Sequence, residues 1–418
     1  MTQTDLIIIG AGPGGYRAAE YAAKNGLKVT IFESGHVGGT CLNVGCIPTK
    51  TYVHAASFSE AIERQPLVVE QLRNGIESIL SHPNITLIRE KAAFVDAHTV
   101  CSASYDSLTA RNIIIATGSE TKWLPIEGTD TDPRVVDSTG LLQLKEQPKR
   151  LAIIGAGVIG MEFASVFNRF GTEVTVIEYL KECLPALDSD IAKRLRKTLE
   201  KQGVNFKMKT AVQSLGNIDA DCILMATGRK PRTEGLNLAA AGISLATNGS
   251  IPVDDHFQIV NSKSSNSKLF AIGDVNGRQM LAHAAEMQGI HVVNQILGKH
   301  DHIRFDIMPA AIFTTPEAAC VGATEDLLKA QGTAYECRKA FHRANGKALT
   351  MNETEGMLKL FSEPDASRIL GCHAFGTHSA DLVQEVSVLM CRDTTVKQLR
   401  DMVHIHPTLS EILLSAAE

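Results

Sequence analysis

Cys41 and Cys46 stand five positions apart in the run GGTCLNVGCIPTK, residues 38–50. Two neighbouring thiols can cycle between a dithiol and a disulfide, and in this way they carry an electron pair. On an ideal helix, residues five apart have Cα atoms about 8.6 Å from each other, whereas a disulfide needs a separation below about 7 Å. We therefore predict an irregular segment between the two cysteines, with Gly45 supplying the conformational freedom.

The residues after Cys46 indicate where the next helix begins. Pro48 favours a helix that starts just beyond the second thiol. The partial positive charge of a helix N-terminus stabilises a thiolate, so we predict a lowered pKa for Cys46. If this helix covers 46–50, Lys50 lies on the same face and adds a cation. The alternatives are a solvated lysine and two unpaired core cysteines, which a reducing compartment would favour.

A glycine-rich turn precedes the cysteines, and a second copy follows later in the chain. LIIIGAGPGG at 6–15 and LAIIGAGVIG at 151–160 each predict a strand, a Gly-x-Gly-x-x-Gly turn and a helix start, and the strands that follow end at Glu33 and Glu178. Such glycines let the backbone approach a pyrophosphate at a helix N-terminus, and the acid accepts hydrogen bonds from ribose hydroxyls. One such turn is weak evidence, but two copies in register predict two dinucleotide sites.

The remaining patterns complete an α/β fold with three domains. Each copy closes on a strand that ends in Ala-Thr-Gly, and a further buried strand at 269–275 ends in Gly273 and Asp274. From about residue 301 the chain predicts strands at 356–364 and 368–376 and a helix at 380–391, while the Ser- and Asn-rich stretch 261–268 predicts an exposed turn. We expect two Rossmann-like dinucleotide-binding domains and a C-terminal α+β domain, with boundaries at 1–140 plus 232–300, 141–231 and 301–418.

The C-terminal run HIHPTLSE, residues 404–411, is a second candidate for chemistry. Pro407 is well placed as a first helical residue, which puts His406 at the cap and Glu411 about one turn inside, close enough to orient the imidazole. An oriented imidazole can take a proton from a thiol near neutral pH. Read alone, a His before a Pro is a surface cap, and His404 is expected to pack.

Composition excludes several classes of function. The chain has 418 residues, 44% hydrophobic and 21% charged, and its 41 basic and 46 acidic residues are dispersed without the basic stripe that nucleic acid binding needs. No apolar stretch approaches the roughly 20 residues that span a bilayer. The N-terminus leaves no room for an export signal, and nine scattered cysteines do not form a disulfide framework. We expect a cytoplasmic protein without a membrane or metal partner.

Together these motifs resemble those of the pyridine nucleotide–disulfide oxidoreductases of the glutathione reductase class, and most closely those of the dihydrolipoamide dehydrogenases. The resemblance runs nearly end to end. It covers GAGPGG, GGTCLNVGCIPTK, both Ala-Thr-Gly closures, GAGVIGME, FAIGDV with MLAHAAEMQG after it, and HPTLSE.

The resemblance implies FAD on the first copy and NAD on the second. The residues that it places around FAD are Gly10, Gly12, Gly14, Gly15, Glu33, Gly39, Thr40, Lys50, Thr117, Gly118, Gly273, Asp274, Met280, Leu281, Ala282 and His283. Those that it places around NAD are Gly155, Gly157, Val158, Ile159, Gly160, Glu178 and Gly228. Because a carboxylate at Glu178 would repel a 2′-phosphate, we expect NAD rather than NADP.

The same resemblance assigns roles to the catalytic residues of an FAD-dependent dihydrolipoamide dehydrogenase. Cys41 exchanges with the substrate dithiol and Cys46 faces the flavin, which passes hydride to NAD⁺. Lys50 approaches the flavin and pairs with Glu162. His406, with Glu411, completes the site of the other subunit, so we expect a homodimer whose substrate is a lipoyl-carrying protein or a small dithiol.

Three stretches depart from the family pattern. Residues 211–228 are shorter than the usual strand-rich hairpin, the region between Lys50 and Ala116 is trimmed, and the chain stops seven residues after Glu411. One alternative is therefore an NAD(P)H-dependent reductase of another low-molecular-weight disulfide. Another, of a different class, is a flavin-bound interaction or sensor protein, whose sequence mark would be a broken redox constellation. A peroxide-reducing or diaphorase-type oxidase would generally show one active cysteine.

Overall fold

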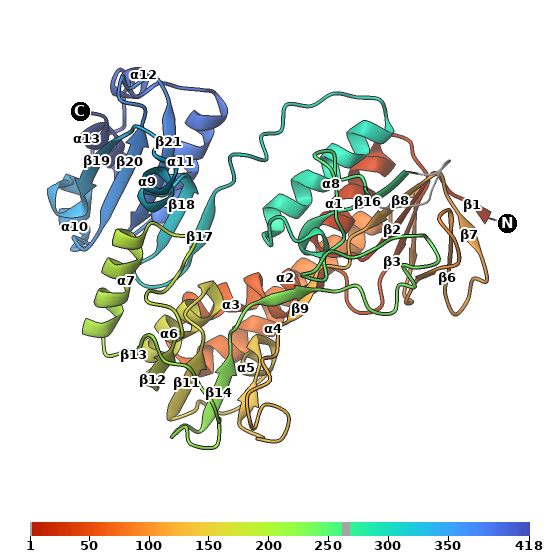
Figure 1. Ribbon diagram of the computed structural model, residues 1–418, viewed down its shortest axis with the longest axis horizontal. Helices are drawn as coiled ribbons and strands as arrows, with labels where there is room; N and C mark the ends of the chain where they lie inside the picture. Colours follow the sequence, from red (N-terminus) through yellow and green to blue (C-terminus); the bar gives the residue numbers. More distant parts are fainter. Residues whose placement is uncertain (1, 261–267) are drawn as a thin grey trace. The chain divides into compact units, whose positions relative to one another are not determined.

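The computed structural model describes residues 2–260 and 268–418 (Figure 1). The turn predicted at 261–268 lies outside the described residues, apart from Lys268. The chain forms two compact units. Unit 1 comprises Met1–Tyr52, Ser59–Lys122 and Gly228–Ile303, and unit 2 comprises Val53–Phe58, Trp123–Thr227 and Arg304–Glu418.

Unit 1 is built around a five-stranded parallel sheet. In spatial order its strands are β16 (Lys268–Ala271), β8 (Asn112–Ile115), β2 (Leu6–Ile9), β3 (Val29–Phe32) and β4 (Ile85–Ile88). The central strands read as unbroken apolar runs because a parallel sheet of this kind is buried on both faces. The structure confirms the strand, glycine turn, helix and second strand predicted from residue 6 to Glu33. Helix α1 (Pro13–Lys24) begins directly after Gly12.

Two helices of unit 1 approach each other closely beside this sheet. They are α1 and α8 (Ala282–Ile296), which pack together in Figure 1. A Cβ at Gly289 would lie 2.8 Å from the carbonyl oxygen of Gly14, so only glycine allows this spacing. The middle of α8 is thereby held against the start of α1.

Smaller elements complete unit 1. They are a four-stranded sheet of β1 (Thr2–Gln3), β7 (Leu108–Thr109), β6 (Thr99–Cys101) and β5 (Ala93–Phe94), the antiparallel pair β9 (Ser119–Thr121) and β15 (Arg229–Pro231), the 3-10 helix η1 (Gly273–Asn276), and helices α2 (Gly39–Val44), α3 (Cys46–Val53) and α4 (Phe58–Leu80). The pair β9–β15 joins the residues that follow the two Ala-Thr-Gly closures.

Unit 2 contains a second parallel sheet with the same core pattern. In spatial order its strands are β10 (Val135–Val136), β14 (Cys222–Met225), β11 (Arg150–Ile154), β12 (Glu173–Ile177) and β13 (Asn205–Lys207), with helices α5 (Ser138–Leu142), α6 (Val158–Arg169) and α7 (Ser189–Lys201). Between β13 and β14, residues 208–221 form a single isolated bridge, Ser214 with Glu127. Most of this connection belongs to the stretch 211–228 that the sequence marks as shortened.

The C-terminal part of unit 2 is an antiparallel sheet covered by helices. Its strands are β17 (Ala310–Ile312), β18 (Ala318–Gly322), β21 (Ile369–Phe375), β20 (Met357–Ser362) and β19 (Glu336–Phe341), and its helices are α9 (Glu325–Gln331), η2 (His342–Ala344), α10 (Gly346–Met351), α11 (Ser379–Cys391), α12 (Val396–Arg400) and α13 (Glu411–Ala417). The two strands and the long helix predicted here are confirmed. The predicted fold class, two Rossmann-like cores and an α+β C-terminal part, is confirmed as well.

One predicted helix start is wrong. Helix α13 begins at Glu411 and not at Pro407. The carboxylate of Glu411 accepts a hydrogen bond of 2.8 Å from the Thr408 N–H, and the Thr408 hydroxyl donates to the Ile405 carbonyl over 2.7 Å. These bonds hold residues 405–410 as a turn, because the backbone groups that a helix would use are taken by side chains.

The domain boundaries predicted at 140/141, 231/232 and 300/301 remain a proposal. The chain crosses between the two compact units at 122/123, 227/228 and 303/304, and the short segment Val53–Phe58 also belongs to unit 2. Among the residues that the structure describes, no helix is long and apolar enough to cross a membrane.

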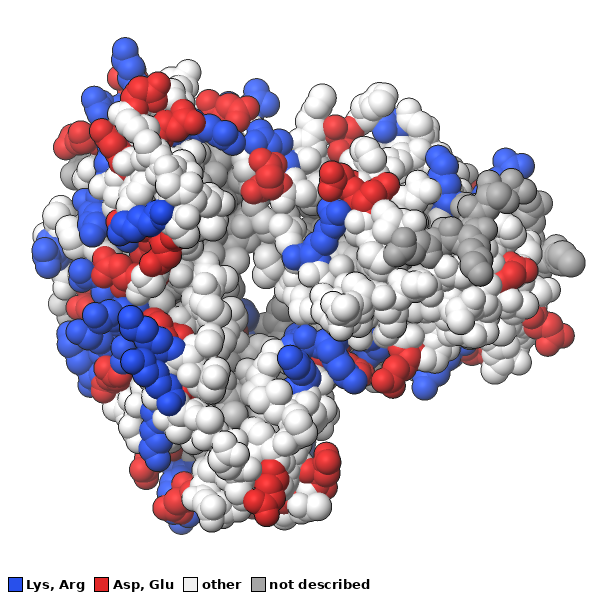
Figure 2. Space-filling view, viewed as in Figure 1, with Lys and Arg blue, Asp and Glu red and all other residues white. Residues whose placement is uncertain are grey.

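Charge on the visible face is mixed. In Figure 2 basic side chains gather over α7, whose exposed cations are Lys193, Arg194, Lys197 and Lys201. Acidic residues interrupt them, since Asp190 pairs with Arg194 at 3.0 Å and Glu200 pairs with Arg196. This pattern is typical of a solvated helix face.

We predict that Gly160→Ala lowers the free energy of unfolding by about 2 kcal/mol or more, as overpacking of a core does. An added Cβ would lie 2.0 Å from the carbonyl oxygen of Gly155. The matched control is Gly346→Ala at the start of α10, where nothing lies within 4 Å of the new Cβ. Thermal and urea unfolding of both variants checks this, and an equal change in the two would contradict it.

Candidate redox site

The cysteine segment is built directly onto the first glycine turn. The Ala11 N–H donates to Glu33 Oε2 over 2.8 Å, and the Ala11 carbonyl accepts from the Gly38 N–H over 2.8 Å. Gly39 has φ +56°, and a Cβ there would lie 2.8 Å from the Cα of Gly12. The backbone that carries Cys41 therefore starts in contact with the turn expected to hold a pyrophosphate.

The break predicted between the two thiols is present. Helix α2 ends at Val44, and Gly45 takes φ −139° and ψ −113°. A Cβ at Gly45 would lie 2.8 Å from the Thr40 carbonyl oxygen. Helix α3 then begins at Cys46 itself, so the second thiol sits at a helix N-terminus.

The two sulfurs share one hydrogen bond. Cys41 is half-buried and Cys46 is exposed. The hydrogen bond to Cys46 raises the pKa of Cys41 well above its ordinary value, burial and the Glu286 carboxylate add to this, and Lys50 acts in the opposite direction. In the reduced pair this favours the protonated form of Cys41.

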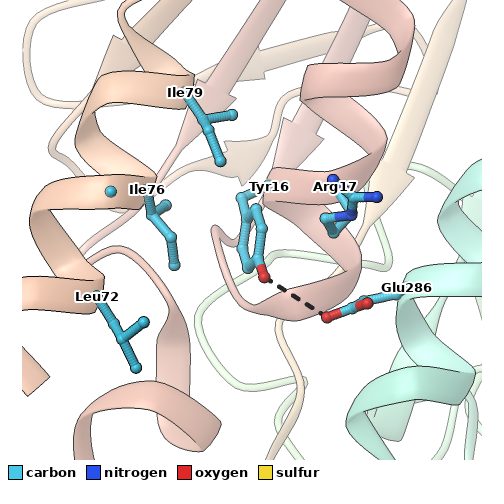
Figure 3. Close-up of a pocket in the computed structure, with 7 residues that line it drawn as sticks. Tyr16, Arg17, Leu72, Ile76, Ile79 and Glu286 are labelled. Carbon is cyan, nitrogen blue, oxygen red and sulfur yellow. Dashed lines mark hydrogen bonds between the residues drawn. The ribbon is translucent and has the colours of Figure 1, made fainter. Parts of the chain in front are cut away.

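A pocket of about 420 Å³ lies in the same unit (Figure 3). Figure 3 shows an apolar wall from α4 opposite a polar wall from α1 and α8, the labelled residues being Leu72, Ile76 and Ile79, then Tyr16, Arg17 and Glu286. Burial and Glu286 raise the pKa of Tyr16 to about 12, so its hydroxyl stays protonated and donates to Glu286 at 3.5 Å. Burial also raises the pKa of Glu286. Cys41 adds to the raised pKa of Tyr16, and Glu286 adds to the raised pKa of Cys41, so the polar wall of this pocket lies within electrostatic range of the Cys41 thiol.

The first turn fits the phosphates of FAD. A Cβ at Gly10 would lie 2.4 Å from the Ala116 carbonyl oxygen, and one at Gly15 would lie 1.9 Å from the Gly10 carbonyl oxygen. At Gly12 the nearest atom is 4.0 Å away. The first and third glycines therefore pack against protein, whereas the second borders open space, as close approach of a pyrophosphate requires.

Asp274, predicted to serve the flavin side, is held by residues that the sequence did not single out. Its Oδ2 accepts from the Ser119 hydroxyl over 2.5 Å, and that hydroxyl accepts from Arg229 Nε over 2.7 Å. Ser119 and Arg229 each follow an Ala-Thr-Gly closure, so this repeated position could have revealed them. Gln288 accepts from the Gly273 N–H over 2.8 Å, and its buried amide nitrogen has no hydrogen-bond partner among the described residues. The Gln288 amide nitrogen can therefore donate to a ligand that carries several hydrogen-bond acceptors.

The other positions expected around FAD lie in the same unit. Thr117 donates to the Arg232 carbonyl over 2.6 Å, and Gly118 has φ +73°. Leu281 precedes the first turn of α8, and the remaining positions there are Met280, Ala282 and His283.

The second turn repeats this geometry in unit 2. The Ala156 N–H donates to Glu178 Oε2 over 2.6 Å. No atom lies within 4 Å of a Cβ built at Gly157, whereas one at Gly155 would lie 2.5 Å from the Ala226 carbonyl oxygen. Gly228, also expected around NAD, belongs to unit 1, and a Cβ there meets no atom within 4 Å. Val158 and Ile159 open helix α6 directly after the turn. A second dinucleotide therefore fits here by the same criterion.

Lys50 and Glu162 belong to different units, so their predicted pairing stays a prediction. Glu162 is buried on α6, and its Oε1 accepts from the Phe313 N–H over 2.9 Å. Lys50 lies on α3 with Cys46.

The C-terminal motif presents one histidine and packs the other. His406 Nδ1 lies 2.8 Å from Glu411 Oε1, and its side chain is 78% exposed. The Thr408 N–H and His406 together hold the pKa of Glu411 below its ordinary value. His404 bonds Glu385 over 3.1 Å with 7% of its side chain exposed, so it packs. An ionised Glu411 thus fixes the orientation of an accessible imidazole.

Within the described ranges, no group of three or more His, Cys, Asp or Glu residues could hold a metal ion. Two dinucleotide turns and a redox dithiol define the class of protein: an oxidoreductase that moves electron pairs between a thiol pair and bound dinucleotides.

Comparison with known proteins gives the family. Residues 4–289 match the model of the pyridine nucleotide-disulphide oxidoreductases, and residues 308–417 match the dimerisation domain of that family. The mitochondrial dihydrolipoyl dehydrogenase of Pisum sativum is 36% identical, with 99% of this chain and 91% of the relative covered. Dihydrolipoyl dehydrogenase 3 of Haloarcula marismortui is 34% identical, over 100% and 96%. A solved structure of the HOCl-induced flavoprotein disulfide reductase RclA from Escherichia coli superposes with a TM-score of 0.91 at 34% identity, covering 99% of both chains.

This chain belongs to the class I pyridine nucleotide–disulfide oxidoreductases, flavoproteins that use FAD and a nicotinamide nucleotide. Its dimerisation domain supports a homodimer.

We predict that Cys46→Ala makes Cys41 react faster with iodoacetamide in the reduced protein. Removing Cys46 removes the hydrogen bond that raises the pKa of Cys41, and a fall of one unit gives up to about tenfold more thiolate near neutral pH. Mass spectrometry of the alkylated peptides measures the rate. Exposed Cys391 serves as the internal control whose rate stays the same, and an unchanged or slower rate at Cys41 would contradict the prediction.

Proposed function

We propose that the protein is an FAD-dependent dihydrolipoamide dehydrogenase that passes electrons from a dithiol to NAD⁺. The observation that carries the proposal is the hydrogen-bonded pair Cys41–Cys46 built onto the first dinucleotide turn. Relatives 34–36% identical over nearly the whole chain carry this name. The catalytic set is Cys41, Cys46, Lys50, Glu162, His406 and Glu411. A cytoplasmic location is part of the proposal.

The chain's own residues would carry out the thiol chemistry as follows. His406, oriented by Glu411, takes the proton of one substrate thiol, and the resulting thiolate attacks Cys41 of the Cys41–Cys46 disulfide. A mixed disulfide forms and Cys46 leaves as a thiolate. The second substrate thiol then attacks the substrate sulfur, closes the substrate disulfide and gives its proton to Cys41.

The raised pKa of Cys41 suits this final proton transfer to Cys41, because the interchange thiol must hold a proton while Cys46 stays ionised. FAD, when bound, accepts the electron pair and passes it to NAD⁺ as hydride. Lys50, on the helix of Cys46, supplies positive charge near that thiolate.

The pocket whose polar wall lies within electrostatic range of Cys41 supports a neutral, aliphatic dithiol. Its wall of Leu72, Ile76 and Ile79 suits a hydrocarbon arm, and its charged side chains are one arginine and one carboxylate, Arg17 and Glu286. Oxidised glutathione carries four carboxylates and would need more cations than this pocket offers. The amide-linked aliphatic arm of lipoamide has no charge to neutralise.

Glu178 supports NAD over NADP. Its carboxylate lies at the end of β12 and accepts from the backbone N–H groups of Ala156 and Leu180 over 2.6 and 2.7 Å. Those bonds fix the carboxylate where a 2′-phosphate would have to lie, whereas free ribose hydroxyls can donate to it.

A second candidate is a reductase that works in the opposite direction on another low-molecular-weight disulfide. The observation that favours it is the similarity to RclA, a flavoprotein disulfide reductase, at a TM-score of 0.91 with 99% of both chains covered. The short connection at 208–221 also departs from the pattern of the dihydrolipoamide dehydrogenases. The class of flavin-bound sensor proteins gains no support, since the redox residues are intact.

The decisive measurement compares substrates with the purified flavoprotein. We expect NAD-linked oxidation of dihydrolipoamide to exceed NADH-linked reduction of oxidised glutathione at least tenfold, and NADH to be preferred over NADPH by a similar factor. Activity confined to a non-lipoyl disulfide would overturn the first proposal in favour of the second. Comparable rates with both nucleotides at low concentration would remove the assignment of NAD.

A second prediction tests whether His406 serves the site of the other subunit. A heterodimer of a His406→Ala chain with a Cys46→Ser chain contains one intact site if the histidine acts in trans. We expect such heterodimers, purified through two different tags, to regain up to about half of the wild-type activity. The two homodimeric variants are the controls. No recovery in a verified heterodimer speaks against the trans arrangement.

A further inference from the structure

The residue between the first two glycines is held in the same way in both turns. In the first copy, the Ala11 N–H donates to Glu33, and the Ala11 carbonyl accepts from the Gly38 N–H. In the second copy, Ala156 gives its N–H to Glu178 over 2.6 Å, and its carbonyl accepts from the Leu184 N–H over 3.0 Å. Both polar groups of this residue are therefore fixed by the segment that follows the next strand.

The segment of the second copy, residues 178–188, leads away from the nucleotide turn. Leu184 lies in the left-handed region at φ +50° and is buried, as is Leu187, whose N–H donates to the Leu184 carbonyl over 2.9 Å. A leucine has a steric cost in this conformation, so the surroundings must hold it there. The segment ends at Asp188, which caps α7.

Asp188 is completely buried and is bound by the C-terminal sheet. Lys359 of β20, 1% exposed, donates to Asp188 Oδ1 over 2.7 Å. The Glu325 N–H donates to Oδ2 over 3.1 Å. The Asp188 N–H donates to Nδ1 of His373 on β21 over 3.1 Å. Three elements of the C-terminal part thus fix the position of one residue.

The charges in this cluster balance when Lys329 is counted, because Lys359 pairs with both Asp188 and Glu325, and Lys329 also pairs with Glu325. His373 Nδ1 accepts a backbone N–H, so Nε2 carries the proton toward the Ala323 carbonyl at 3.2 Å and the ring is neutral. Burial lowers the pKa of His373 to about 4, in agreement with that state. Lys359 also donates to Glu325 over 2.6 Å. A paired, fully bonded buried cation of this kind specifies a geometry more than it adds stability.

We propose that Asp188 and Lys359 are positioning residues for the second dinucleotide site, where they anchor the segment 178–188 that holds Ala156. The inference rests on the proposed binding of a nicotinamide nucleotide at that turn. The anchor acts through Leu184 and Glu178 on the peptide between Gly155 and Gly157. Its loss lets the turn adopt conformations that do not bind the pyrophosphate, which lowers the apparent affinity.

The test uses the full-length flavoprotein carrying Asp188→Asn together with Lys359→Met. Asparagine still caps α7, and the double change leaves neither Asp188 nor Lys359 as an unpaired buried charge. Lys339→Met is the matched control, because Lys339 faces Lys359 across the β19–β20 ladder but is exposed. We expect the dissociation constant of NADH, from fluorescence titration, to rise about tenfold in the double variant and to stay the same in the control.

A second measurement distinguishes weakened nucleotide binding from a general structural defect. Reduction of the bound flavin by excess dihydrolipoamide needs no nicotinamide nucleotide, so we expect its rate to stay within about twofold of wild type. An unchanged NADH dissociation constant, or an equal loss in this half-reaction, overturns the inference.

Amide hydrogen exchange without nucleotide tests the anchor independently of the proposed function. We expect the amides of Ala156 and Leu184 to exchange about tenfold faster in the double variant, with no change in the control. If the wild-type protein does not bind NADH at all, the proposed function fails, and exchange alone decides the inference: faster exchange at these two amides supports the anchor and equal exchange refutes it.

Discussion

The structure depends on how one small residue is held in each glycine turn. Ala11 and Ala156 each lie between two glycines, where the backbone has more freedom than elsewhere, and each has both of its polar groups bonded by the segment after the next strand. The carboxylate at the end of the second strand accepts a hydrogen bond from the N–H of this alanine. A backbone N–H five or six residues later donates to the carbonyl of the same alanine. Without these bonds the turns would have no fixed shape to offer a pyrophosphate.

The two copies use the same bonds for different purposes. In the first, the bonding residue Gly38 leads within three residues to Cys41, so the redox pair takes its position from the dinucleotide turn. In the second, the corresponding segment runs on to Asp188 and joins the turn to the antiparallel sheet. One repeated backbone arrangement therefore connects the dithiol to the first glycine turn and the C-terminal sheet to the second.

Much of this was accessible from the sequence because it is local. The glycine spacing, the terminal acids, the apolar strands and the break at Gly45 are each specified by residues close together in the chain. The features that were missed depend on long-range contacts. Lys359 stands in a run that predicts a strand, but nothing near it in the sequence reveals that it is 1% exposed and bonded to Asp188, 171 residues away. The start of α13 is an exception with a local cause, since the side chains of Thr408 and Glu411 bond backbone groups within three residues and so displace the helix start.

Val403 and Ile405 are 99% and 80% exposed and flank the packed His404 in the loop that presents His406. Two branched aliphatic side chains in water disfavour the isolated subunit, and the dimerisation domain offers a way to cover them. By mass action, the fraction of chains in which this loop is covered then rises with protein concentration. The concentration of the protein in the cell would then determine what fraction of it is active.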